Sequence, residues 1–130
     1  MRVLALRTDK PEAELYLFDG DKKIAELKWL AHLKLAETLN SKIEEILNKL
    51  SISYDDLDAV AAYKGPGSFT GLRIGMSVAN AIAYSQNIAI VVKSGDDWLE
   101  QSLNAINGGH NDEIAVPEYG GAARTTKPRK

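Results

Sequence analysis

The sequence predicts one α/β domain with a mixed five-stranded sheet and helices on its faces. Three apolar segments separated by short turns open the chain, which is typical of an antiparallel meander. After residue 30 the apolar residues recur at intervals of three and four, which is typical of helix. Two later apolar segments each follow a helical stretch, as parallel strands joined by crossovers do. The length of 130 residues suits a single domain.

The opening meander shows alternating apolar residues. Leu15 and Leu17 share one face of the second segment, and Tyr16 and Phe18 share the other. An Asp19-Gly20 step follows, which is a strong hairpin signal between two apolar runs. We therefore expect strands at residues 2–8, 13–20 and 22–29.

The first long helix is expected at residues 31–50. Its apolar stripe extends to Leu33 and Ala36, beyond what one sheet face would cover, which favours a second packing surface. After it, Ser53 to Asp56 has the pattern of a capping box and predicts a short helical turn. The residues at helical intervals are Leu35, Leu39, Ile43, Ile46, Leu47 and Leu50.

The second half of the domain is predicted to alternate strand and helix. Residues 57–65 form a continuous apolar run that ends in a turn, the pattern of a central parallel strand. A meander that pairs with such a βαβ unit gives a ribonuclease H-like fold. We expect a helix at 68–86, a strand at 88–92, a helix at 96–104, a domain at 1–107 and an extended tail at 108–130.

Composition and charge exclude several classes of function. The chain has no cysteine, which excludes disulfides, thiolate metal sites and a cysteine nucleophile. The formal net charge is -2, so any contact with nucleic acid must come from a local patch. The first residues lack the apolar core of a signal peptide, and no apolar run has the ~20 residues of a membrane span. We therefore expect a cytoplasmic protein that does not contact membranes.

The stretch "YKGPGSFTGLRIGMSVANAIAY", residues 63–84, contains glycines at 65, 67, 71 and 75. A strand, a glycine turn and a helix N-terminus form a general anion site, to which Lys64, Ser68 and Thr70 can add donors. The loop matches neither common phosphate-binding template. No Gly-Lys-Ser/Thr ends it, and Thr70 stands where G-x-G-x-x-G needs its third glycine.

Packing is the second interpretation of these glycines. At helical spacing, Gly71, Gly75, Ala79 and Ala83 form a ridge of small residues that lets another helix approach closely. This ridge packs either on a partner or on the protein's own sheet and first helix. The neighbouring row on the helix consists of Ile74, Val78 and Ile82. The opposite side of the helix carries Arg73, Ser77, Asn80 and Tyr84.

"KGPGSFTGLRIGMSVANAIAY" closely resembles the signature of the TsaB (YeaZ) family. "WLAHLKLAETLNSKIEEIL" resembles the first helix of that family, and the late "VPEYGGA" resembles its Pro-x-Tyr near the C-terminus. The resemblance covers about residues 1–107 and that short piece. Its most specific part is the signature loop, made of Gly65, Pro66, Gly67, Ser68, Phe69, Thr70, Gly71, Leu72 and Arg73.

The resemblance implies an actin-like (ASKHA) fold and a non-catalytic role. TsaB proteins pair with the catalytic subunit TsaD and support threonylcarbamoyl transfer to the adenosine next to the tRNA anticodon, so tRNA is contacted through the complex. The family's pairing surface is a bundle of the first two helices of each partner. We therefore expect a TsaD partner, a homodimer of the free chain, and an interface of Leu35, Leu39, Ile43, Gly71, Gly75, Ala79 and Ala83.

Two departures from the family bear on nucleotide binding. Family members usually carry two similar domains, and the second is essentially missing here, so this is a short single-domain form that cannot close an actin-like cleft alone. The first strand reads Leu6-Arg7-Thr8 where relatives tend to have Leu-Asp-Thr, and Arg7 cannot ligate a metal. We expect no cofactor for this chain alone, and nucleotide only in the complex with TsaD. The alternative is an actin-like enzyme that binds ATP and transfers a phosphoryl or acyl group itself.

The remaining chemistry-bearing residues predict no catalytic or metal site. The place that would pair with His32 in a helical metal site is Ala36, and we expect no role for His110. No activating base stands at motif spacing from Ser68 or Thr70, so we expect Ser68 to be a helix N-cap.

Adjacent carboxylates on a helix do not share a face, so the pairs Asp55-Asp56 and Asp96-Asp97 are expected to cap helix starts.

The tail is basic beyond Pro117, and a basic end can contact a phosphate backbone. Pro117-Glu118-Tyr119 is expected to pin the tail onto the sheet or the partner. The candidate tRNA contacts are Arg124, Lys127, Arg129 and Lys130.

Overall fold

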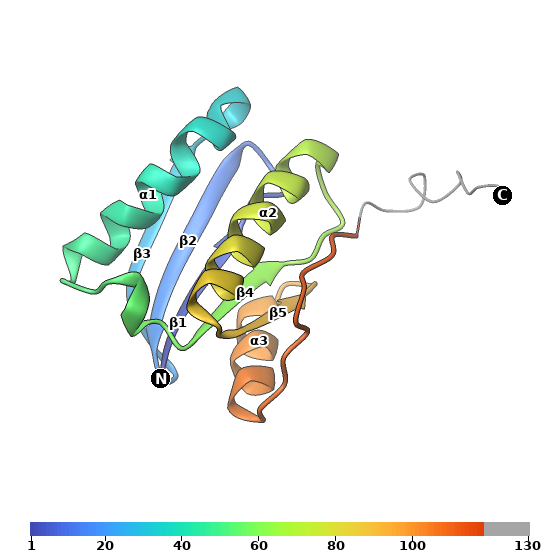
Figure 1. The fold of residues 1–130 in the computed structure, drawn as a ribbon. Coiled ribbons are helices and arrows are strands. Elements are labelled where there is room, and N and C mark those ends of the chain that lie inside the picture. Colours follow the sequence, from blue (N-terminus) through green and yellow to red (C-terminus); the bar gives the residue numbers. More distant parts are fainter. Residues whose placement is uncertain (119–130) are drawn as a thin grey trace, which may run out of the picture.

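The computed structural model describes residues 1–118, which form one mixed sheet with helices on both faces (Figure 1). The strand order is β3-β2-β1-β4-β5, with β1–β2 and β2–β3 antiparallel and β1–β4 and β4–β5 parallel. The strands are β1 Arg2–Arg7, β2 Glu12–Asp19, β3 Lys22–Leu30, β4 Ala59–Tyr63 and β5 Ala89–Lys93. The helices are η1 His32–Lys34, α1 Leu35–Lys49, η2 Tyr54–Asp56, α2 Phe69–Gln86 and α3 Trp98–Asn107.

The alternation of side chains along the strands divides the core into two layers. Leu4 of β1 lies opposite Leu17 of β2, and both face α1 and α2. The next pair, Ala5 and Tyr16, faces α3, where Trp98 packs edge-on against the ring of Tyr16. The mixed five-stranded ribonuclease H-like sheet predicted from the sequence is therefore confirmed.

The predicted element boundaries differ by more than one residue in three places. The helix expected at 31–50 is divided, because the N–H groups of Ala31 and His32 donate to the Pro11 carbonyl and His32 has φ +47°. The strand expected at 57–65 is β4, which is shorter because the N–H of Leu57 closes the η2 turn. The helix expected at 96–104 is α3, which begins after Gly95, a glycine with φ +96°.

Residues 110–118, which we call the strap, run along edge strand β5 rather than away from the domain (Figure 1, red-orange). The N–H groups of Ile90 and Val92 donate to the side chains of Asn111 and Asp112, at 3.1 and 2.9 Å. The N–H of Asp112 donates to the Ile90 carbonyl at 2.8 Å. The strap therefore satisfies backbone groups that an edge strand would leave open.

Two further contacts hold the strap. The side chain of Asn80 in α2 accepts from the N–H of Ala115 at 2.7 Å and donates to its carbonyl at 3.1 Å. The N–H of Glu118 donates to the Lys64 carbonyl at 2.8 Å, beside the signature loop. Glu118 of the Pro-Glu-Tyr segment thus lies on the sheet as expected, and Tyr119 lies outside the described residues. Within residues 1–118, no helix is long and apolar enough to cross a membrane.

Candidate functional site

The signature loop connects β4 to α2 at the carboxyl edge of the sheet. Gly65 has φ +115°, and a Cβ there would lie 2.2 Å from the carbonyl oxygen of Glu118 in the strap. Ser68 is the N-cap of α2, because its Oγ accepts from the N–H of Gly71 at 3.2 Å. The N–H of Ser68 itself donates to the Asp9 carbonyl. The prediction that Ser68 caps the helix is confirmed.

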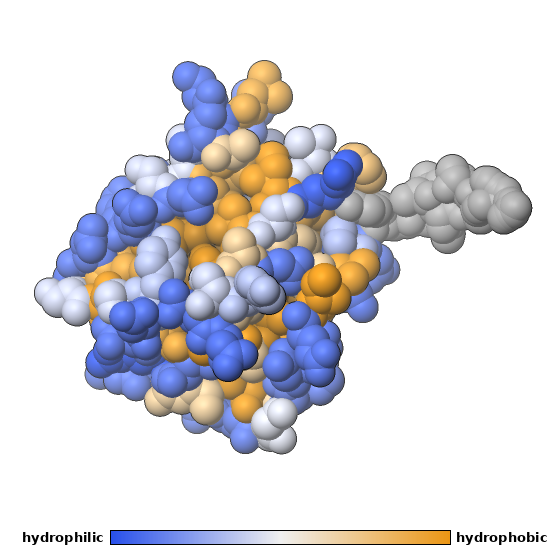
Figure 2. All heavy atoms as spheres, viewed as in Figure 1, coloured by the Kyte–Doolittle hydropathy of each residue, from blue (hydrophilic) through white to orange (hydrophobic). Residues whose placement is uncertain are grey.

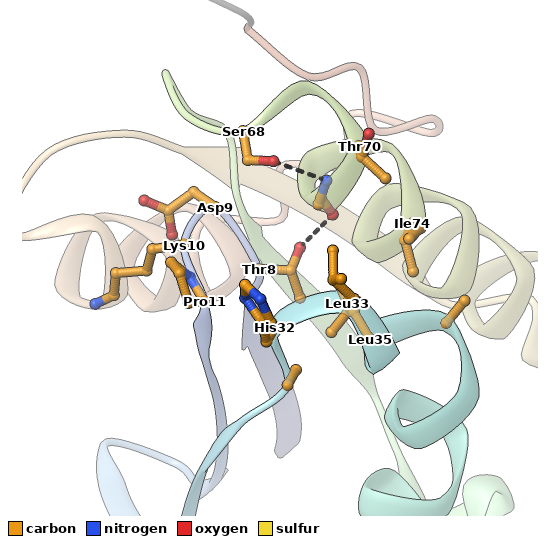
Figure 3. A pocket seen from close by; sticks show the side chains of 13 residues that line it. Thr8, Asp9, Lys10, Pro11, His32, Leu33, Leu35, Ser68, Thr70 and Ile74 are labelled. Carbon is orange, nitrogen blue, oxygen red and sulfur yellow. Dashed lines mark hydrogen bonds between the residues drawn. The ribbon is translucent and has the colours of Figure 1, made fainter.

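Gly71 and Gly75 face Thr8 at the end of β1. A Cβ on Gly71 would lie 2.2 Å from the Thr8 carbonyl oxygen, and a Cβ on Gly75 would lie 2.1 Å from the Thr8 Oγ1. The same Oγ1 donates to the Gly71 carbonyl at 2.9 Å (Figure 3). These two glycines therefore serve the close approach of α2 to the chain's own sheet.

The assignment of the small-residue ridge to a partner interface is therefore wrong. Ala79 and Ala83 are buried in the core between the sheet and the helices α1 and α2. The α1 residues of that assignment, Leu35, Leu39 and Ile43, are also buried against the sheet. Periodicity grouped these residues correctly, but the face they form is the inner one.

A groove does lie on the outer side of the same two helices. It consists of two adjoining hollows of about 360 and 410 Å³, and Ser77 and Val78 line both. Half-buried Ile74 and Val78 form its floor, and exposed Ala36 lies on its α1 side. Figure 2 shows apolar atoms gathered between α1 and α2 on this face. We call these two hollows the helix groove.

Three large side chains on α2 and before α1 are exposed, and one of them, Phe69, lines the helix groove. Phe69 at the start of α2 is 53% exposed, and Leu33 before α1 is 88% exposed. Tyr84, which shares the outer face of α2 with Ser77 by helical spacing, is 90% exposed. Exposed apolar patches are typical of interaction sites, which makes the helix groove the candidate here.

A third hollow of about 460 Å³ continues from the helix groove to the carboxyl edge of the sheet. The β1–β2 turn, the start of α1 and the first turn of α2 enclose it, and Figure 3 shows Lys10 pointing away from Thr70 and Ile74. Half of its side chains are apolar, and the other half are polar or charged. The anion-site interpretation of the loop would place a ligand here.

An internal ion pair lies beside that hollow. The Arg7 Nε donates to Asp9 Oδ1 at 2.8 Å, and the guanidinium lies 3.9 Å from the centroid of the Tyr63 ring. The hydrogen bond to Asp9 raises the pKa of Arg7 above its ordinary value. The carboxylate of Asp9 in the β1–β2 turn is therefore already paired with the guanidinium of Arg7. These residues do not fit a magnesium–phosphate group, which needs free oxygen ligands.

A buried carboxylate lies next to the ion pair. Glu14 accepts from Lys10 Nζ at 2.7 Å and from the Tyr16 hydroxyl at 2.5 Å. Burial alone would raise the pKa of Glu14, but these two hydrogen bonds outweigh it, and the pKa lies below its ordinary value. Burial and the bond to Glu14 raise the pKa of Tyr16. Each group has its partner within the chain, which indicates a structural role.

The described part of the chain contains no cluster of metal-ligating side chains. No group of three His, Asp or Glu side chains there could hold a metal ion. His110 contacts Asp112 of the strap at 2.7 Å.

The expected capping by paired carboxylates is confirmed for Asp56, which closes a capping box with Ser53. It is wrong for Asp97, whose side chain accepts from Gln101 instead of capping α3. The expected tRNA contacts Arg124, Lys127, Arg129 and Lys130 lie outside the described residues.

The sheet order and the helices define the class of protein, a ribonuclease H-like domain of the actin-like kind. YeaZ from Pseudomonas aeruginosa superimposes with a TM-score of 0.67 at 24% identity, over 72% of this chain and 43% of that one. RuvC of Thermus thermophilus, solved with a Holliday junction substrate, gives a TM-score of 0.54 at 10% identity, over 92% and 85% of the two chains. Both likenesses concern the fold.

Sequence comparison identifies the family. The family model for TsaD, tRNA N6-adenosine threonylcarbamoyltransferase, matches residues 29–108. The TsaB protein of Bacillus subtilis, described as a tRNA threonylcarbamoyladenosine biosynthesis protein, is 32% identical over 92% of this chain and 50% of its own length. The threonylcarbamoyltransferase of Clostridioides difficile is 31% identical over 70% of this chain and 31% of its own length.

The chain therefore belongs to the TsaD family, and its type within that family is TsaB (YeaZ), as the resemblance predicted. It spans about half the length of the TsaB relative that it matches.

Proposed function

We propose that this chain is the accessory subunit that pairs with a TsaD-like catalytic subunit and supports threonylcarbamoyl transfer to the adenosine next to the tRNA anticodon. One observation carries the proposal: the helix groove, an apolar groove between α1 and α2, is left open on the outside of a complete core. The same two helices form the pairing surface in the family that the sequence resembles. The pairing surface is thus their outer face.

The ion pair of Arg7 and Asp9 supports a non-catalytic role. It places a cation where an actin-like enzyme would handle a metal and a phosphate, and it engages the nearby carboxylate. The chain alone then holds no nucleotide, and nucleotide binds only in the complex. Calorimetric titration of the isolated chain with ATP and magnesium tests this point. Micromolar affinity would favour the alternative, an enzyme that uses ATP itself.

Co-elution of the chain with the TsaD-like protein of the same organism tests the pairing. An assay of threonylcarbamoyladenosine in tRNA, with and without this chain, tests the supporting role. We expect a stable complex and modification that depends on the chain. A TsaD-like protein that neither binds the chain nor gains activity from it would contradict the proposal.

The basic residues at 124, 127, 129 and 130 are proposed to contact tRNA within this complex. Neutralised phosphates make binding salt-dependent, with a slope of about one ion per contact. Replacing the four cations with glutamine should weaken the binding of the complex to tRNA and flatten the salt dependence. An unchanged slope would remove these residues from the proposal.

A further inference from the structure

The helix groove carries a single charge. Among the described residues that line its two hollows, Arg73 is the only charged side chain, and no carboxylate lines either hollow. The other lining residues are apolar, hydroxyl-bearing or amide side chains. Any partner that covers this groove must therefore accommodate one cation within an otherwise uncharged surface.

Arg73 is held in place without an acidic partner in the described part of the chain. It is exposed, and its guanidinium carbon lies 5.2 Å from the centroid of the Phe69 ring one turn earlier in α2. The ion pairs of residues 1–118 involve Arg7, the N-terminus, His110 and several lysines, but not Arg73. A cation above an aromatic face leaves its N–H groups available to a carboxylate.

The floor of the groove has the geometry of a helix contact. Ile74 and Val78 are one turn apart, and Ser77 and Ala81 present small side chains beside them. Rows four residues apart on one helix receive the ridges of another helix. Grooves of this kind bind amphipathic helices through apolar anchors at intervals of three and four residues.

We propose that the partner helix that lies in the helix groove places a carboxylate on Arg73. This inference rests on the proposed pairing function and names the chemistry of its partner. A carboxylate can take two parallel N–H donors from the guanidinium, which fixes the register of the docked helix. Arg and aromatic residues at the centre of an interface carry most of its binding energy.

A second copy of this chain is a poorer occupant than a distinct partner. Two such grooves facing one another would place two copies of Arg73 in one interface, and neither lining supplies a carboxylate. Like charges placed opposite one another in an interface cost several kcal/mol. The charge of the groove therefore favours a heterologous partner.

Charge reversal tests the inference. Arg73→Glu should weaken binding to the TsaD-like protein about thirtyfold or more, because it leaves a buried carboxylate facing another. Lys22→Glu makes the same change of charge at an exposed residue that begins β3. In the sheet, β3 is one edge strand and β5 is the other. This control variant should leave binding unchanged. Both variants should keep the thermal unfolding of the isolated chain, since both side chains are exposed.

Zero-length coupling identifies the carboxylate. In Arg73→Lys, carbodiimide activates a contacting carboxylate, the lysine amine displaces the activated group, and an amide bond forms with loss of the urea by-product. Mass spectrometry should find this bond to an Asp or Glu on a helix of the TsaD-like protein. A bond to a glutamate of a second copy of this chain would overturn the inference.

Two failures are distinguishable. If the unmodified chain does not bind the TsaD-like protein, the proposed function fails and this inference fails with it. If Arg73→Glu binds as well as the unmodified chain, only the inference fails, and the pairing function stands.

Discussion

The Oγ1 of Thr8 donates to the carbonyl of Gly71 at 2.9 Å, and it thereby joins the end of β1 to the first turn of α2. Thr8 is almost completely buried, and its side chain also occupies the space where Gly75 lacks one. A helix can come this close to a strand only where glycine removes the Cβ. The glycines of the signature sequence therefore set the distance between α2 and the sheet.

Gly75→Ala should destabilise the fold. Its Cβ would lie 2.1 Å from the Thr8 Oγ1 and 3.2 Å from the Thr8 Cβ, so α2 or β1 must shift. Overpacking of this kind costs about 1–3 kcal/mol, measured as the free energy of unfolding in urea. Had Gly75 belonged to the partner interface, as expected from the sequence, such a change would have affected pairing more than stability.

Two comparisons make the test specific. Gly108→Ala adds a Cβ at φ -81° with its nearest contact at 3.5 Å, an ordinary distance, and should change stability by about 0.5 kcal/mol or less. Thr8→Ala combined with Gly75→Ala should cost less than the sum of the two single changes, because the shortened side chain makes room. Strict additivity would show that the two residues do not press on one another.

Local patterns predicted most of the fold. The Asp19-Gly20 turn and the alternation of Leu15 to Phe18 fix the β2–β3 hairpin from neighbouring residues alone. The break before α1 was missed because it depends on Pro11, whose carbonyl accepts two N–H groups from residues that lie about twenty positions later. The strap was missed because side chains, those of Asn111 and Asp112, satisfy the edge strand instead of a regular ladder.

The candidate interface was predicted on α1 and α2, but its residues lie on the buried faces of these helices. Helical spacing shows that Gly71 and Gly75 share a face with Ala79, but it does not show which element that face meets. Thr8, more than sixty residues earlier, decides the matter. The neighbouring row of Ile74 and Val78 was visible in the sequence, and it is the row that forms the floor of the helix groove.

The stability of the domain should depend on Glu14 in acid. Its folded pKa lies below the ordinary value of 4.5, so its contribution is complete above that pH and is lost as the pH falls through the lower, folded value. Glu14→Gln should therefore lower the free energy of unfolding by about 1–3 kcal/mol at pH 7 and by less near pH 3. Denaturant titrations at the two pH values measure the difference.

Glu37→Gln is the matched control, since it makes the same chemical change at an exposed glutamate of α1. It should change stability little at either pH. If Glu14→Gln were equally destabilising at pH 7 and pH 3, the loss would come from packing and not from the carboxylate that Lys10 and Tyr16 bind.

The strap should open when Asn80 is changed to alanine. The Asn80 side chain is the partner of both the N–H and the carbonyl of Ala115, and Ala115 is buried. Leaving buried backbone groups without partners costs about 1–3 kcal/mol. Hydrogen exchange at the amides of residues 111–118 should quicken. Ser77→Ala, which changes an exposed residue of the same helix, should leave hydrogen exchange at these amides unchanged. If the amides exchanged equally fast in both variants, β5 alone would hold the strap.

Ala36→Glu should abolish pairing and leave the fold intact. Ala36 is exposed and lines the helix groove on its α1 side, so the isolated chain has room for the longer side chain and loses only the small difference in helix propensity. In a complex the longer, charged side chain would occupy the hollow that Arg73 also lines and exclude the partner, which should weaken binding about a hundredfold. Ser41→Glu places the same charge on α1 away from the groove and should bind normally.

Co-elution with the TsaD-like protein and the thermal melt of each variant are the two measurements. Normal co-elution of Ala36→Glu would move the partner surface away from the helix groove, whereas a lowered melt would mean that Ala36 supports the core.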